Sequence, residues 1–187
     1  MVKENRFRLW NLLFTHRNYY ENLPQGWILT TYSAVLNSVF GGGTPSKTNL
    51  SYWNGDISWC SVKDLGEKLI IMNTIDSITI EGLKNSSSRM VEKGDLILCT
   101  RMAVGKLRIA GKSMEINQDL KGLVTSKKIN KLFFIMQVNA TNFIGSGTTV
   151  KGLQIADFMT HAFILPPLKE QSRIVNKIDD LFSLLFH

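Results

Sequence analysis

Residues 162–187 read AFILPPLKEQSRIVNKIDDLFSLLFH, a stretch that changes from strand to helix within a few residues. Its first four residues are apolar and predict a strand. Pro166 and Pro167 end that strand, because proline has no backbone N–H to donate to a neighbouring strand. Pro167 also suits the first position of a helix, where the missing N–H costs nothing. We therefore expect a strand over 162–165 and a helix from residue 167 onward.

The residues after Pro167 carry a single stripe of mostly apolar side chains. Its members recur at steps of three and four, as in the opening turns of a coiled-coil seam: Gln171, Ile174, Ile178, Leu181 and Leu185. One stripe of this kind cannot bury itself and needs another helix to cover it. We expect its four aliphatic members to face a helix from this chain, from a partner or from a second copy.

Upstream of this segment, residues 25–166 predict one mixed domain. Short runs rich in β-branched and aromatic residues alternate with turns of Gly, Asn and Ser. We expect strands at 56–62, 69–72, 75–80 and 95–100, a hairpin arm at 104–110, and helices at 131–139 and 153–159. Residues 1–24 predict a separate leader or docking segment. The fold class is α+β: a single globular domain with a mixed β-sheet and flanking helices, followed at 167–187 by the start of a long coiled-coil helix.

The charge of the chain points to a polyanionic partner. Its 187 residues include 22 Lys and Arg against 15 Asp and Glu, a net charge of +7. No acidic residue lies between residues 95 and 115, a window that holds four basic ones: Arg101, Lys106, Arg108 and Lys112. Basic side chains that face phosphates release counterions and so favour association with nucleic acid.

The distribution of apolar residues and cysteines indicates the cellular compartment of the protein. No apolar run approaches the ~20 residues that a membrane span needs, and the apolar stretch after the basic residues 1–8 lacks a signal-peptide cleavage site. Cys60 and Cys99 are the only cysteines, each within an apolar run and without metal-binding spacing. We expect two buried free thiols in a cytoplasmic protein that contacts no membrane.

The glycine-rich stretch 41–48, GGGTPSKT, comes near to a phosphate-binding P-loop but departs from it. Ser46 stands where that motif requires its second glycine. The residues that follow, 49–56, are rich in Asn, Ser and aromatic side chains rather than helix formers. A nucleotide-binding enzyme built on 41–48 therefore stays an alternative only. We interpret the stretch as a flexible glycine turn that lets backbone amides approach a surface or a phosphate.

The sequence lacks motifs for catalysis. An amino-methyltransferase needs an Asn-Pro-Pro-aromatic motif, and the one Pro-Pro pair here follows Leu165. A metal-dependent nuclease needs clustered carboxylates with a lysine close behind, and no Glu-x-Lys spacing occurs. His16, His161 and His187 lie far apart, so neither a metal cluster nor a hydrolytic triad is indicated. We expect no catalytic residue, metal or cofactor in this chain.

Nine segments resemble, in order, the frame of the target-recognition domain of type I restriction-modification specificity subunits. They are Gly26-Trp27, Gly42–Ser46, Tyr52–Trp59, Ser61–Leu65, Lys93–Leu98, Gly105-Lys106, Asn117-Gln118, Gly145–Gly152 and Leu165–Gln171. Each match alone is weak, but together they span nearly everything from residue 26 onward. The chain is therefore similar to a module that reads duplex DNA.

The resemblance implies a non-catalytic subunit in which two recognition domains, separated by long helices, each read one half of a split DNA target. It also implies partners that supply the chemistry: methylase (modification) subunits and, for restriction, a nuclease/translocase subunit. This chain departs from that pattern with one recognition domain, a helix of about five turns at ~3.6 residues each, and Tyr32-Ser33 where relatives commonly carry Leu-Gly. The first two departures leave open a half-subunit, a truncated product or an excised domain.

Ten residues are candidates for contact with DNA, because such a module anchors phosphates with basic and hydroxyl groups and places a few side chains at base edges. The expected phosphate anchors are Thr44, Ser46, Lys47 and Lys63. Three basic residues are expected to reach the groove, where Arg is the commonest reader of guanine: Arg101, Lys106 and Arg108. A second glycine-rich stretch is expected to do either, through Ser146, Thr148 and Lys151. Trp53 and Trp59 are expected to pack in the core, since duplex DNA offers no unstacked base.

Two further hypotheses stay open. The same domain can belong to a fused restriction-methylation enzyme, in which it follows a methylase. Alternatively, the terminal helix alone can matter, as a scaffold without DNA binding. If two copies paired through that helix, the two-fold dimer would present the same surface twice and read a symmetric site.

Overall fold

The computed structural model describes residues 23–141, 143 and 152–185. These residues group into two compact units. Unit 1 contains residues 23–35, 126–141 and 156–185, and unit 2 contains residues 36–125, 143 and 152–155. Both units combine strands with helices, which confirms the predicted α+β class. The predicted boundaries at residues 25 and 167 divide the chain differently and stay a prediction.

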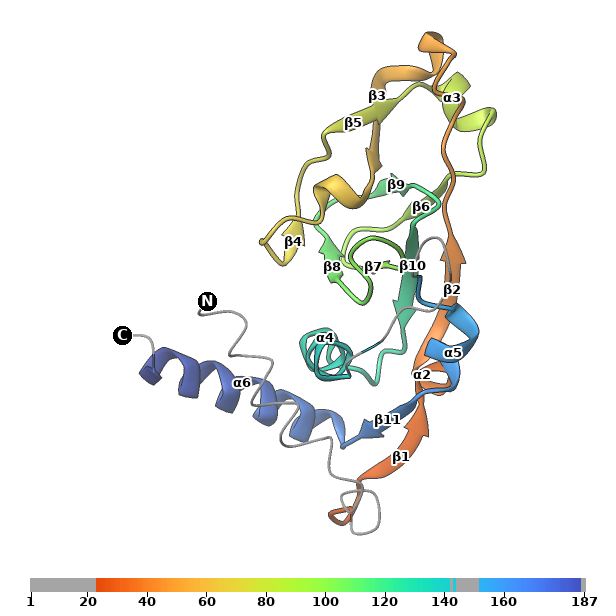
Figure 1. The fold of residues 1–187 in the computed structure, drawn as a ribbon. Coiled ribbons are helices and arrows are strands. Elements are labelled where there is room, and N and C mark those ends of the chain that lie inside the picture. Colours follow the sequence, from red (N-terminus) through yellow and green to blue (C-terminus); the bar gives the residue numbers. More distant parts are fainter. Residues whose placement is uncertain (1–22, 142, 144–151, 186–187) are drawn as a thin grey trace. The chain divides into compact units, whose positions relative to one another are not determined.

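Unit 1 is built on a two-stranded antiparallel ribbon (Figure 1). In this ribbon β1 (Ile28–Thr31) pairs with β11 (Ala162–Leu165). Its helices are α2 (Tyr32–Val35), α4 (Lys131–Ala140), α5 (Ile155–Thr160, which starts at the last residue of unit 2) and α6 (Leu168–Leu185). The ribbon thus joins the first described residues to the segment that leads into α6.

An aromatic cluster forms the core of unit 1 around Tyr32. The Tyr32 ring is fully buried and stacks on Phe158, with the ring centroids 4.6 Å apart. Phe163 and Phe134 meet it edge to face, at 5.1 and 5.4 Å. Each such pair contributes about 0.5–1.5 kcal/mol beyond the burial of area. The Tyr32-Ser33 departure from the resembling pattern is therefore accommodated by aromatic packing.

Helix α4 is positioned by polar side chains at its start and along its buried face. Asn130 caps the helix, because its side-chain oxygen accepts hydrogen bonds from the N–H groups of Leu132 and Phe133 at 2.9 and 3.2 Å. Further along, the buried Gln137 carboxamide donates to the Ile164 carbonyl and accepts from the Ile164 N–H at 3.1 Å. Gln137 therefore ties α4 to β11 as a neighbouring strand would.

Helix α6 is tied to the start of α4 by a second carboxamide, that of Gln171, which is 0% exposed. Its oxygen accepts from the Asn130 N–H at 2.8 Å. Its nitrogen donates to the carbonyls of Lys128 and Pro166, at 3.1 and 2.9 Å. Val175, one turn further along α6, is also buried. The first turns of α6 therefore belong to the core of unit 1.

The start of α6 differs by one position from the expectation. The N–H groups of Glu170 and Gln171 donate to the Pro167 carbonyl at 2.8 and 3.0 Å. Pro167 thus lies just before the first helical residue, Leu168, and its carbonyl accepts the first hydrogen bonds of the helix. Its lack of an N–H remains harmless there.

The predicted stripe along α6 becomes more exposed toward the C-terminus. Ile174 and Ile178 are half-buried, whereas Leu181 is 46% exposed; Leu184, which is not a member of the stripe, is 79% exposed. The side chain of Leu185 lies outside the described residues. Contact of the stripe with another helix, and the coiled coil itself, stay predictions.

Unit 2 contains two sheets. The larger has the strand order β2-β10-β7-β8-β4. Its strands are β2 (Leu36–Gly41), β10 (Leu120–Thr125), β7 (Leu96–Cys99), β8 (Leu107–Ala110) and β4 (Ile70–Ile71). All its pairings are antiparallel except β4 with β8.

The smaller sheet of unit 2 has the order β5-β3-β9-β6. Its strands are β5 (Asp76–Ile78), β3 (Trp53–Cys60), β9 (Met114–Ile116) and β6 (Arg89–Val91). Two 3-10 turns, η2 (Leu50–Tyr52) and η3 (Val62–Asp64), flank β3, and helix α3 (Ile80–Lys84) follows β5. Only β3 and β9 run parallel among these pairs.

The core of unit 2 lies around β7, whose four residues are all buried. Cys60 of β3 and Cys99 of β7 belong to the same buried cluster, and both are free thiols, as predicted. Burial raises the pKa of both thiols above its ordinary value. They therefore act as small apolar core residues rather than as nucleophiles.

The longest patterns of the sequence are confirmed within a few residues. The predicted strands at 56–62, 95–100 and 162–165 correspond to β3, β7 and β11, and the helices at 131–139 and 153–159 to α4 and α5. The run 75–80 is divided between strand β5 and the first residue of α3. None of the described helices is long and apolar enough to cross a membrane.

Replacing Gln171 with leucine is expected to destabilise the protein. Leucine cannot satisfy the two carbonyls and the N–H that this carboxamide binds, so the free energy of unfolding should fall by about 2 kcal/mol or more. Denaturant unfolding measures this, with Gln25→Leu at an exposed position as the matched control, expected within about 0.5 kcal/mol of the parent. Equal stability of the two variants would show that the Gln171 bonds contribute nothing.

Candidate nucleic-acid interface

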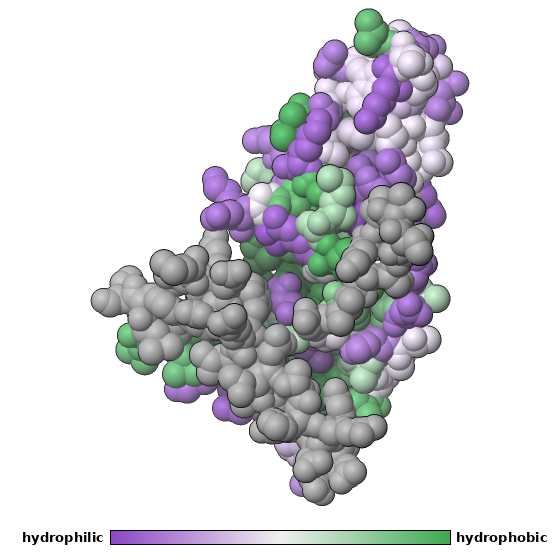
Figure 2. Space-filling view, viewed as in Figure 1, coloured by the Kyte–Doolittle hydropathy of each residue, from purple (hydrophilic) through white to green (hydrophobic). Residues whose placement is uncertain are grey.

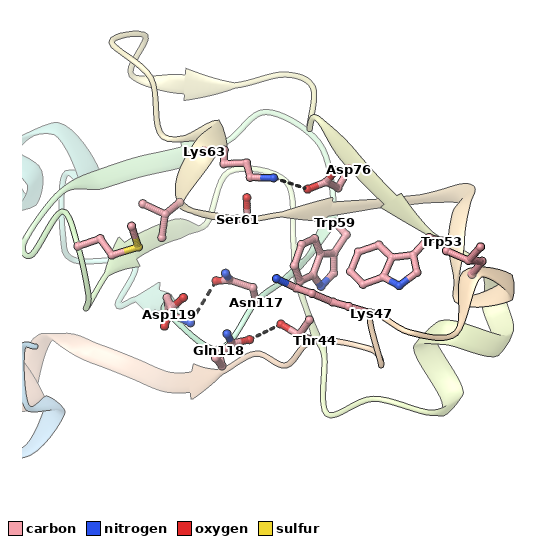
Figure 3. Close-up of a pocket in the computed structure, with 13 residues that line it drawn as sticks. Thr44, Lys47, Trp53, Trp59, Ser61, Lys63, Asp76, Asn117, Gln118 and Asp119 are labelled. Atoms are coloured by element: carbon pink, nitrogen blue, oxygen red, sulfur yellow. Dashed lines mark hydrogen bonds and ion pairs between the residues drawn. The ribbon is translucent and has the colours of Figure 1, made fainter. Parts of the chain in front are cut away.

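A cavity of about 670 Å³ opens on unit 2, where the glycine-rich loop meets β3 and the turn between β9 and β10 (Figure 3). Its lining combines two tryptophans with lysines, carboxylates, carboxamides and exposed apolar side chains. These residues are Thr44, Lys47, Leu50, Trp53, Trp59, Ser61, Val62, Lys63, Asp76, Met102, Asn117, Gln118 and Asp119. The cavity therefore combines an aromatic wall with both charged and apolar side chains.

The glycine-rich loop is held by close backbone packing. A Cβ on Gly42 would overlap the backbone of Ile116, and one on Gly43 would overlap Ser87 and lie 2.8 Å from the Ser88 nitrogen. The Gly43 N–H donates to the Ile116 carbonyl at 3.0 Å. The interpretation as a flexible turn that offers amides to a phosphate is therefore wrong for Gly43, whose amide is used inside the unit. Glycine is needed here because the loop passes against the end of β9.

Two tryptophans of β3 hold the same loop by its carbonyls. The Trp59 indole N–H donates to Gly43 at 3.0 Å, and that of Trp53 donates to Ser46 at 3.1 Å. The two rings meet edge to face at 5.1 Å. Trp59 is buried, as expected, whereas Trp53 is half-buried and lines the cavity. The loop residues between these bonds, including Thr44, are thereby fixed beside the cavity.

The Asp64 carboxylate fixes the wall that carries Lys63. One oxygen accepts from the Ser61 N–H at 2.7 Å and from the Ser61 hydroxyl at 3.3 Å, and the other accepts from the Ile75 N–H at 2.7 Å. This capping box sets the short turn η3. Lys63, one residue before Asp64, is exposed, and its ammonium lies 3.5 Å from Asp76.

The turn between β9 and β10 forms the opposite wall and is bound on both sides. The Asn117 N–H donates to the Cys60 carbonyl at 3.0 Å, and its side-chain oxygen accepts from the Asp119 N–H at 3.1 Å. The Asp119 carbonyl accepts from both the N–H and the hydroxyl of Thr100 at 2.9 Å. Between these anchors stands Gln118, whose carboxamide oxygen accepts from the Thr44 hydroxyl.

Met102 stands out on the rim of the cavity. Its side chain is 82% exposed, and its φ of 63° lies in the left-handed region that residues other than glycine rarely adopt. The preceding residue, Arg101, places its guanidinium 3.7 Å from Asp119. A residue held in this region of backbone space costs free energy, and such residues cluster at functional sites.

Positive and negative side chains are mixed at the cavity. Lys47 makes no ion pair with the part of the chain that the structure describes, and Figure 3 shows its side chain reaching toward Asn117 and Gln118. Exposed pairs such as Lys63 with Asp76 contribute about 0–1 kcal/mol. A phosphate can therefore compete for either lysine. Around β3, β5 and α3 the visible surface is mostly hydrophilic or of intermediate hydropathy (Figure 2).

The structure brings three of the predicted phosphate anchors, Thr44, Lys47 and Lys63, to this one cavity. Ser46 lies on the same loop, where its hydroxyl is 2.8 Å from that of Thr48. A role in DNA binding stays a prediction for all of them.

The predicted groove residues have different environments. Arg101 lies beside the cavity through its contact with Asp119, and Lys106 is half-exposed on the β7–β8 hairpin. Arg108 donates from two nitrogens to the Gly66 carbonyl and from the third to Leu107, and burial lowers its pKa. These contacts leave Arg108 poorly placed to read bases.

Most of the second glycine-rich stretch, including Ser146, Thr148 and Lys151, lies outside the described residues. The next residue, Gly152, pairs with Arg101 as an isolated bridge, and the Leu153 N–H donates to Thr100 at 2.8 Å.

Sequence reasoning missed Asn117, Gln118, Asp76 and Met102 as site residues. A signal existed for the first two, because the segment Asn117-Gln118 was part of the resembling frame. Nothing in the sequence marked Asp76 or Met102, whose positions depend on strand pairing and on the turn after β7.

Residues 24–186 match the model of the type I restriction modification DNA specificity domain. That match spans most of the chain, and the chain belongs to this family.

Curated relatives carry the same description. The chain is 25% identical over 182 residues to the EcoR124I/EcoR124II specificity subunit of Escherichia coli, covering 89% of this chain and 45% of that protein. It is 26% identical over 172 residues to the MjaIX specificity subunit of Methanocaldococcus jannaschii, covering 86% and 40%. The chain thus spans less than half the length of these relatives. A fused enzyme and a nucleotide-binding enzyme are not favoured.

Solved structures show the same fold. A chain from a study of complex assembly and conformational transition in the type I R-M system superimposes with a TM-score of 0.75 at 20% identity, covering 98% of this chain and 45% of that one. The HsdS subunit from Thermoanaerobacter tengcongensis gives a TM-score of 0.68 at 19% identity, covering 98% and 44%.

Alanine at Gly42 is expected to disturb the cavity through the backbone of β9. Its Cβ has no room beside Ile116, so the free energy of unfolding should fall by about 1–3 kcal/mol. Gly66→Ala is the matched control, since a Cβ there meets nothing within 4 Å. Denaturant unfolding of both variants is the measurement, and a Gly42→Ala protein as stable as the Gly66→Ala protein would contradict the close packing.

Glu115 of β9 should make stability depend on pH. It is buried, its Oε2 has no hydrogen-bond partner among the described residues, and burial raises its pKa above the ordinary 4.5, against a smaller opposing effect of Ser88. As the pH rises above about 4.5, the unfolded chain releases this proton before the folded chain does, so stability falls. Glu115→Gln should remove this part of the decline in unfolding free energy as the pH rises above about 4.5; an unchanged profile would show that the carboxyl is solvated.

Proposed function

We propose that this chain is a sequence-specific duplex DNA recognition module that directs the subunits of a type I restriction-modification system to one half of a target site. The observation that carries the proposal is the match to the DNA specificity domain across residues 24–186. The cavity on unit 2 supports the proposal, because basic, hydroxyl and carboxamide groups lie together there on turns that are held by hydrogen bonds.

The physical division of labour follows from these groups. Lys47 and Lys63, exposed at the cavity, would neutralise phosphates and set affinity and its salt dependence. Arg101 and Lys106 on the β7–β8 hairpin would extend this contact. Side chains on the rigid turns of the cavity would reach the base edges. Contacts with base edges, and not contacts with phosphates, distinguish one sequence from another.

The chain would act without chemistry of its own, as a non-catalytic part of a specificity subunit in the cytoplasm. The partners proposed for it are methylase (modification) subunits and a nuclease/translocase subunit, in line with the description of its relatives as specificity subunits of type I restriction enzymes. The exposed Leu181 and Leu184 at the end of α6 offer a surface for another helix, from a partner or from a second copy.

Neutralising the cavity lysines should weaken duplex binding and reduce its dependence on salt concentration. For Lys47→Gln and Lys63→Gln we expect the slope of log K against log salt to become shallower by about 1 for each phosphate that is no longer neutralised. Fluorescence anisotropy with a duplex, titrated at several salt concentrations, measures this slope. The matched control is Lys93→Gln, an exposed lysine outside the cavity lining. If the slopes of Lys47→Gln and Lys63→Gln equalled that of Lys93→Gln, the cavity would not be the surface that binds DNA.

A functional test uses methylase subunits of a type I system. The assembly with this chain should methylate duplexes at a defined sequence, and methylation by the isolated chain would contradict the non-catalytic role.

A further inference from the structure

We infer that Gln118 is a specificity-determining residue that reads adenine at one position of the target, with Thr44 as its positioning residue. The inference rests on the proposed function and names the chemistry of its site. The juxtaposition behind it is a carboxamide at the tip of a bound turn, oriented by a hydroxyl from the facing loop (Figure 3).

The backbone on both sides of Gln118 is held in place. Asn117 is bonded to Cys60 and to the Asp119 N–H, and the Asp119 carbonyl accepts two hydrogen bonds from Thr100. A base-reading side chain needs such a mounting, because each degree of freedom frozen on binding reduces affinity. Gln118 itself remains exposed, so its side chain reaches solvent from a fixed base.

The carboxamide of Gln118 is half engaged. Its oxygen accepts from the Thr44 hydroxyl, which sets the plane of the group. Its nitrogen has no hydrogen-bond partner among the residues that the structure describes. A carbonyl oxygen has two lone pairs, so one acceptor site and two N–H donors stay available. An acceptor beside a donor matches the major-groove edge of adenine, which offers the N6 amino group and the N7 acceptor.

Other polar groups of the cavity fit this role less well. Asn117 is only 6% exposed, and its oxygen is used within the turn. Asp76 and Asp119 are paired with Lys63 and Arg101. The lysines offer only donors, which suit phosphates or guanine. Gln118 is therefore the cavity residue whose exposed chemistry is specific for adenine.

The test compares base preferences of the full chain and its variants after selection from a random duplex library. The parent should enrich adenine at one position, and replacing that base with 7-deazaadenine, which lacks the N7 acceptor, should weaken binding by about 5- to 150-fold. Gln118→Ala should lose the preference at that position alone and be insensitive to the 7-deaza substitution. Gln118→Glu should change the preference to cytosine, whose N4 amino group donates to a carboxylate.

Thr44 variants separate positioning from folding. Thr44→Val removes the hydroxyl that orients Gln118 and should reduce the adenine preference, whereas Thr44→Ser keeps a hydroxyl and should retain the preference. Gln154→Glu, the same chemical change at an exposed residue outside the cavity lining, should leave the selected sequence unchanged.

Two failures are distinguishable. If the parent chain shows no sequence preference among duplexes, the proposed function is wrong and the inference falls with it. If the parent selects a sequence and Gln118→Ala selects the same one at every position, only the role of Gln118 is overturned.

Discussion

The structure of unit 2 depends on the contact between the backbone of Gly42-Gly43 and the end of β9. A side chain at Gly42 would overlap the backbone of Ile116, one at Gly43 would overlap Ser87, and the Gly43 N–H is bonded to the Ile116 carbonyl. Once the loop is held, Trp59 and Trp53 bind its carbonyls from β3, and Thr44 comes within reach of Gln118 on the following turn. Three segments far apart in sequence become one surface because two residues carry no Cβ.

The parts of this fold that could be predicted are those with a long repeating pattern. The strand before Pro166 and the helix after it needed only local rules, and β7 is apolar throughout because all of its residues are buried. Strands such as β6 and β9 have three residues each. Three residues carry no period, and these strands exist through pairing with β3 and with each other. Glu115 even places a buried carboxyl within β9, against any hydrophobic pattern.

The residue types of the candidate site could be predicted from the sequence, but the groups that each side chain contacts could not. Thr44, Lys47 and Lys63 were expected from their chemistry, and the fold brings them to one cavity. Arg108 has the same chemistry, yet its guanidinium is occupied by the Gly66 carbonyl. What separates these cases is the neighbourhood of each cation, which depends on contacts across more than forty positions of the chain and leaves no mark in the local sequence.

Carboxamides show how one chemical group serves both the fold and recognition. Gln137 and Gln171 are buried, and their hydrogen bonds to the described residues go to backbone groups of their own unit, so they fix helices in place. Asn117 does the same for a turn. Gln118 differs because it is exposed and its oxygen accepts a single hydrogen bond, from the Thr44 hydroxyl, while its nitrogen has no partner among the described residues. A group that is half satisfied keeps its orientation and still has bonds to offer, and this combination is what reading a base edge requires.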